Sequence, residues 1–243
     1  MDFSLLELAV LALAAFSVGV AKGGIPGFAI IGVVSVPMIM SAKLSTGYIL
    51  PFLLFADVLA VLYWRKAALW HHIAALLPAM VVGIAVGWLC MDRIDDALYG
   101  KLLGGIVLFL IALDWLRRRY ALPIPVNSRP FAWSMGFLAG IMTMLANSAG
   151  PVLMLYLLSM NLSKEELVST NAWMYLLVNL IKVPFSIQLG LISPDSFQTN
   201  LMMAPAVVLG IVTGIVFMRR IPEQVFSTLM RLLALAGAVK MLF

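Results

Sequence analysis

Apolar segments close to the length of a membrane span recur along this chain from one end to the other. A helix needs roughly 20 apolar residues to cross the hydrocarbon core of a bilayer. The 243 residues are 63% hydrophobic and 11% charged, whereas a soluble domain is only about half apolar. The sequence therefore predicts an all-α, polytopic membrane protein whose function lies within the bilayer.

Charged residues and Pro/Gly positions divide the apolar runs into about ten helical elements in two halves. The first half, residues 1–116, has predicted elements at 4–21, 26–41, 45–64, 69–91 and 98–116. The second half, residues 131–243, has predicted elements at 131–146, 151–161, 165–190, 198–218 and 223–242. Residues 117–130, which include three consecutive arginines, are predicted to form a cytoplasmic linker.

The two halves align weakly at an offset of about 125 residues, as internal repeats do. Ser45-Thr46 corresponds to Ser169-Thr170, and each half begins with a hydrophobic hairpin broken by glycine. With the N-terminus outside, most basic residues fall on the cytoplasmic side. This arrangement makes the halves inverted repeats in a bacterial inner membrane, with both termini periplasmic.

The broken hairpins are predicted to dip into the membrane from opposite faces. The element after Pro151 has about 11 residues, or roughly 16 Å of helix, against a hydrocarbon core of roughly 30 Å. It is too short to span, so the hairpin tips are expected near the midplane. Broken helices at this depth are typical of transporter binding sites.

The hairpin tips favour an anionic ligand. The helix after each tip begins with free N–H groups and a positive dipole end, and Lys22 adds a full charge. Glycines allow positive φ and close approach of a ligand. The candidate substrate-binding residues at the tips are Lys22, Gly23, Gly24, Gly27, Asn147, Ser148 and Gly150.

Two charged residues, Asp57 and Lys182, lie deep in later elements, where charge is costly and by default functional. They form either a structural ion pair, with each other as one option, or a site in which Lys182 supports the substrate charge and Asp57 carries a coupling proton. Arg231 is expected to snorkel to the cytoplasmic face. Polar residues that line a pathway or bond between helices are Thr46, Thr170, Asn171 and Asn179.

Catalytic, metal and nucleic-acid patterns are missing from the sequence. It has no Gly-x-Ser-x-Gly and no His-Glu-x-x-His motif, and His71 and His72 have no third ligand at a suitable spacing. Basic residues lie at the ends of apolar runs rather than in a phosphate-binding stripe. We therefore expect no enzyme activity, no cofactor, no metal and no nucleic-acid partner.

Two Gly-x-x-x-Gly motifs are candidates for close helix packing. They span Gly83 to Gly87 and Gly210 to Gly214. Such motifs act within one chain or between the two chains of a homodimer, and the sequence leaves both options open.

Several longer motifs stand out in both halves of the chain. In the first half these are Lys22-Gly23-Gly24-Ile25-Pro26-Gly27, Ser45-Thr46-Gly47 and Tyr63-Trp64-Arg65-Lys66. In the second half they are Gly150-Pro151, Thr170-Asn171-Ala172-Trp173 and Val178-Asn179-Leu180-Ile181-Lys182-Val183-Pro184-Phe185. Taken together, these motifs resemble the TauE/SafE family of sulfite and organosulfonate exporters, and the resemblance covers nearly the whole chain. The tip Asn147-Ser148-Ala149 departs from a Gly-Gly-Pro-like pattern, so we expect it to be either less open or shaped for a different anion.

The resemblance implies a secondary carrier that exports a sulfite, a sulfonate or a similar small anion by alternating access. A proton or a sodium ion is the expected coupling partner, and the lipid bilayer surrounds the protein. A passive anion channel and a carrier of another small organic anion are the alternatives. Substrates do not transfer safely between members of one fold family.

Overall fold

The computed structural model of the chain describes residues 3–25, 28–91, 93, 128–192 and 194–222, together with residues 225 and 228. The helices of the first half are α1 (Leu5–Gly23), α2 (Ala29–Ser35), η2 (Val36–Met38), α3 (Ala42–Tyr48), α4 (Leu50–Trp64), η3 (Arg65–Ala67) and α5 (Trp70–Met91). Those of the second half are α7 (Arg129–Ala146), α8 (Gly150–Ser159), α9 (Lys164–Gln188), α10 (Pro194–Met202) and α11 (Ala204–Arg220). All regular structure in the described residues is helical, which confirms the predicted class.

Some of the predicted features lie outside the described residues. They are the element 98–116, the element 223–242 apart from residues 225 and 228, the linker as far as residue 127, and the residues Gly27 and Arg231.

Serine caps begin several of the helices. At the start of α9, Ser163 Oγ accepts a hydrogen bond from Glu166 N at 3.3 Å, and Glu166 Oε2 accepts one from Ser163 N at 2.9 Å. Ser4 and Glu7 form the same capping box at the start of α1. These reciprocal bonds satisfy N–H groups that a helix start otherwise leaves free.

Proline divides three of the predicted elements, which corrects the sequence prediction. Residues 26–41 contain α2 and the short η2, residues 45–64 lie in α3 and α4, and residues 198–218 are shared between α10 and α11. Each second helix has proline in its first turn. Proline lacks the N–H that continues a helix, whereas hydropathy runs unchanged across the break.

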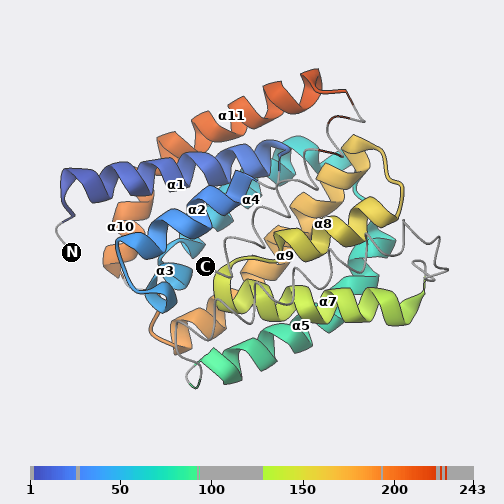
Figure 1. Cartoon of the computed structure of the whole chain (residues 1–243), viewed down its shortest axis with the longest axis horizontal. Helices are drawn as coiled ribbons and strands as arrows, with labels where there is room; N and C mark the ends of the chain where they lie inside the picture. Colours follow the sequence, from blue (N-terminus) through green and yellow to red (C-terminus); the bar gives the residue numbers. More distant parts are fainter. Residues whose placement is uncertain are drawn as a thin grey trace.

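Two tightly packed helix pairs form opposite edges of the molecule. Helix α1 lies along α11 at one edge and α5 lies along α7 at the other, with α4 and α9 in contact between them (Figure 1). The first helix of each half therefore packs against the long fourth element of the other half.

Both Gly-x-x-x-Gly motifs lie at these helix contacts. A Cβ at Gly210 would lie 2.9 Å from Gly19 Cα and closer still to the carbonyl oxygen of Phe16. A Cβ at Gly83 would lie 3.0 Å from Gly140 Cα. The motifs bring backbones into contact within one chain, which is the first of the two options that the sequence left open.

The outer surface is apolar, as expected for a protein in contact with lipid. On α11, the exposed fractions of Leu209, Val212 and Phe217 are 64%, 55% and 56%. Within the described residues, three helical segments are long and apolar enough to cross a membrane: Leu5–Gly23, Leu44–Ala67 and Trp70–Met91. By contrast, α8 has 10 residues, or about 15 Å at 1.5 Å per residue, and does not span. The chain is a multi-pass membrane protein.

The contact between α1 and α11 yields a test of stability. We expect Gly210→Ala to lower the thermal unfolding temperature of the detergent-solubilised protein, because the added methyl meets backbone atoms that no rotamer change moves aside. Overpacking of this kind costs about 1–3 kcal/mol. Val212→Ile is the matched control, since it adds one carbon to the exposed face of the same helix. Equal unfolding temperatures for the two variants would contradict the close contact.

Candidate functional site

A buried ion pair lies where α1, α4 and α9 meet. Lys22 Nζ, in the last turn of α1, lies 2.6 Å from Asp57 Oδ1 on α4. The other carboxylate oxygen, Asp57 Oδ2, accepts a hydrogen bond from Asn179 Nδ2 on α9 at 2.6 Å. The two charged side chains are only 6% and 0% exposed. One oxygen of the buried carboxylate is therefore paired with the Lys22 ammonium group, and the other is hydrogen-bonded to a residue of the opposite half.

Tyr175 forms the other side of the Lys22 environment. Lys22 Nζ lies 3.5 Å from the centroid of the Tyr175 ring, in a cation–π contact. The hydroxyl of Tyr175 reaches the start of α8, where a Cβ at Gly150 would lie 3.1 Å from it. The ring thus lies between the Lys22 ammonium group, at the first hairpin, and the start of α8, in the second hairpin.

Lys182, on α9, is a second fully buried ammonium group. It donates a hydrogen bond to Asn147 Oδ1 and lies 3.5 Å from Thr143 Oγ1. Asn147 ends α7 in the left-handed conformation, with φ 52° and ψ 26°, and its Nδ2 donates to Thr46 O at 2.8 Å. In the part of the chain that the structure describes, Lys182 has neutral oxygens as partners and forms no ion pair.

The charges of this buried cluster do not cancel. In their usual ionisation states Lys22 and Lys182 contribute two positive charges and Asp57 one negative charge, which leaves an excess of one positive charge. A buried charge without a counter-charge is strongly unfavourable. With both lysines charged, a bound anion would supply the missing counter-charge.

The threonines predicted to line a pathway bond to backbone groups of the opposite half. Thr46 Oγ1 donates to Leu145 O at 3.0 Å, and Thr170 Oγ1 accepts from Leu69 N at 2.9 Å. Each contact joins the two halves. Of the two roles expected for these threonines, the contacts therefore favour hydrogen bonding between helices over lining of a substrate pathway.

Trp64 makes a further connection at the end of α4. Its indole Nε1 donates to Gly23 O at 3.2 Å, while its own carbonyl oxygen accepts a hydrogen bond from Ser169 Oγ on α9. Three helices that surround the ion pair are thereby tied together by one residue.

The glycines of the first hairpin lie against α11. Gly24 ends α1 with φ 138°, a conformation open mainly to glycine. A Cβ there would lie 2.8 Å from the Met218 side chain, and one at Gly23 would lie 2.9 Å from Gly214 Cα. Helix packing explains both positions, whereas Gly150 lies beside Tyr175 and the charge cluster.

The remaining predicted residues are placed as follows. Ser148 is buried in the break between α7 and α8. Asn171 on α9 is also buried, and its Oδ1 has no hydrogen-bond partner among the described residues. The ion pair between Asp57 and Lys182 that the sequence offered is not formed: Asp57 pairs with Lys22, because α4 brings it against the last turn of α1.

Sequence reasoning missed Tyr175 and Thr143. Tyr175 lies midway between Asn171 and Asn179, four residues from each, so the three share one face of α9. Thr143 precedes Asn147 by the same interval on α7. The spacing of polar residues along each helix was the available signal.

Comparison with known proteins gives one match. The family model described as sulfite exporter TauE/SafE matches residues 11–241. No curated protein matches the chain, and no solved structure matches it. Among the described residues there is no group of three or more His, Cys, Asp or Glu side chains able to hold a metal ion.

The ion pair yields a test of stability. We expect Asp57→Asn to destabilise the protein by about 3–5 kcal/mol, because it leaves the Lys22 ammonium buried without a counter-charge. The double variant Lys22→Met/Asp57→Asn removes that charge and should recover part of the loss. Thermal unfolding in one detergent measures both. A double variant no more stable than Asp57→Asn alone would contradict the pairing.

Proposed function

Because the chain belongs to the sulfite exporter TauE/SafE family, we propose that it is a secondary transporter that exports small sulfur-containing anions, such as sulfite or an organosulfonate, by alternating access. The observation that carries the proposal is the burial of two lysine side chains, Lys22 and Lys182, beside Asp57, the one buried carboxylate among the described residues. The family consists of transporters rather than enzymes, which agrees with the lack of a catalytic motif in the sequence.

Lys182 is the primary anion-binding group in this proposal. Its present partners, Asn147 Oδ1 and Thr143 Oγ1, are neutral oxygens, and a sulfite or sulfonate oxygen makes a stronger, charge-assisted bond to an ammonium group. The start of α8 at Gly150 adds free N–H groups and a positive dipole end nearby. Tyr175 links this point to Lys22.

The protonation state of Asp57 controls whether Lys22 can bind the anion. The carboxylate neutralises Lys22 in the structure, and an anion that reaches Lys22 competes with it. Protonation of Asp57 would free the ammonium for the anion, which makes Asp57 the candidate carrier of a coupling proton. A sodium ion is the alternative coupling ion.

Inverted repeats and dipping hairpins are part of the same proposal. The reciprocal packing of α1 on α11 and of α7 on α5 supports two related halves, and alternating access commonly uses such repeats around a central site. The inner-membrane location and periplasmic termini come from the distribution of basic residues in the sequence.

The transport role of Lys182 can be measured in proteoliposomes. We expect Lys182→Met to reduce sulfite transport by about ten- to a hundredfold, since loss of one hydrogen bond to a charged group costs about 1.5–3 kcal/mol. Lys66→Met is the matched control, because Lys66 is exposed in η3. Both variants must elute as the wild type does on gel filtration. Wild-type transport by a well-folded Lys182→Met protein would overturn the assignment.

Counterflow separates a carrier from a passive anion channel. We expect labelled sulfite uptake to saturate with concentration and to accelerate when the vesicles are preloaded with unlabelled sulfite. A carrier returns faster when its site is loaded, whereas a channel has no such step. Linear uptake without acceleration would favour the channel, and acceleration by another organic anion alone would favour that anion as substrate.

A further inference from the structure

We infer that a pocket between α5, α7 and α8 is a second oxyanion site, separate from the buried charge cluster. The pocket has a volume of about 500 Å³, within the range of small-molecule sites. It shares no lining residue with the cluster around Lys22 and Lys182. Nothing in the proposed transport mechanism uses it.

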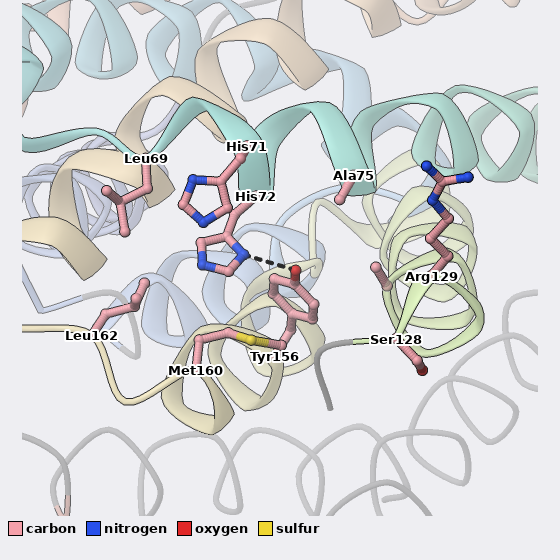
Figure 2. A pocket seen from close by; sticks show the side chains of 10 residues that line it. Leu69, His71, His72, Ala75, Ser128, Arg129, Tyr156, Met160 and Leu162 are labelled. Atoms are coloured by element: carbon pink, nitrogen blue, oxygen red, sulfur yellow. Dashed lines mark hydrogen bonds between the residues drawn. The ribbon is translucent and has the colours of Figure 1, made fainter. Parts of the chain in front are cut away.

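Three basic side chains from two helices line this pocket. His71 and His72 lie in the first turn of α5, and Arg129 is the first residue of α7 (Figure 2). The two imidazole rings lie close together, with centroids 4.1 Å apart. His72 Nδ1 and the hydroxyl of Tyr156, which comes from α8, share a hydrogen bond of 3.0 Å.

The side chains of the pocket suit an anion with several oxygens. Arg129 carries a permanent charge and a planar set of N–H donors that matches an oxyanion. The imidazole rings of His71 and His72, in the first turn of α5, add N–H donors. None of the described residues lining the pocket is acidic, and Arg129 forms no ion pair within the described ranges. The Arg129 guanidinium is therefore available to a ligand, while His72 Nδ1 and the Tyr156 hydroxyl are bonded to each other.

The oxyanion that binds in this pocket could come from the solution or from a lipid headgroup. The pocket lies at the beginning of helices whose flanking loops carry basic residues, the side that the sequence predicts to be cytoplasmic. A free sulfur or phosphorus oxyanion and the phosphate of an anionic lipid headgroup both fit the same donors. The site is defined by the oxyanion, and the experiment separates the two sources.

The two histidines of the pocket are the chain's only histidines. Carbethoxylation of imidazole by diethyl pyrocarbonate therefore reports on this pocket alone, provided that the protein is purified through a tag without histidine. We expect the reaction rate to fall about tenfold when the oxyanion is present at about ten times its Kd, since free sites decline by mass action. The chain is tested in neutral phosphatidylcholine nanodiscs with inorganic sulfate, and separately in phosphatidylglycerol nanodiscs without sulfate.

Two variants connect protection to the pocket. Arg129→Gln should abolish protection, whereas Arg220→Gln, which removes an exposed guanidinium at the end of α11, should retain it. Chloride at equal ionic strength controls for screening. Protection by sulfate, by the anionic lipid or by both supports the site and identifies which of the two supplies the oxyanion. Failure of both to protect, or full protection in Arg129→Gln, would overturn the proposal.

Discussion

Burial of the Lys22 ammonium group sets the strongest constraint on this structure. A charged group taken out of water is costly unless a well-placed counter-charge and further hydrogen bonds compensate it. Here the counter-charge comes from Asp57 on α4, whose second oxygen is satisfied by Asn179 on α9. The ion pair is compensated only when helices from both halves are in place, which couples the assembly of the halves to the formation of the site.

The sequence was informative where a feature is local. Recurring apolar runs predict the helical class, and Ser163 and Glu166 mark the start of α9 through one turn of backbone. The break after α7 is likewise visible in the sequence, because Asn147 ends that helix in a left-handed conformation that asparagine tolerates better than most residues. Depth within an apolar run also identified Asp57 and Lys182 as unusual.

Side-chain pairings between helices far apart in the chain could not be predicted from the sequence. Whether Asp57 pairs with Lys22 or Lys182 depends on how α4 crosses α1 and α9, and both lysines are equally suitable by charge. Tyr175 was missed for a similar reason, since an aromatic residue in an apolar helix is most often a packing residue. Only the neighbouring ammonium group gives its ring a different role.

The glycine contacts at the two edges group the helices into units that do not coincide with the two halves of the sequence. Where Gly19 meets Gly210 and Gly83 meets Gly140, backbones touch with almost no side chain between them, so sliding at these contacts would be resisted more strongly than motion elsewhere. Helices α1 and α11 would then move as one rigid body, and α5 and α7 as another. Each body takes helices from both halves of the sequence. The mechanical units of the protein are therefore mixed pairs: Lys22 lies on α1, within one pair, and Lys182 lies on α9, between the two pairs.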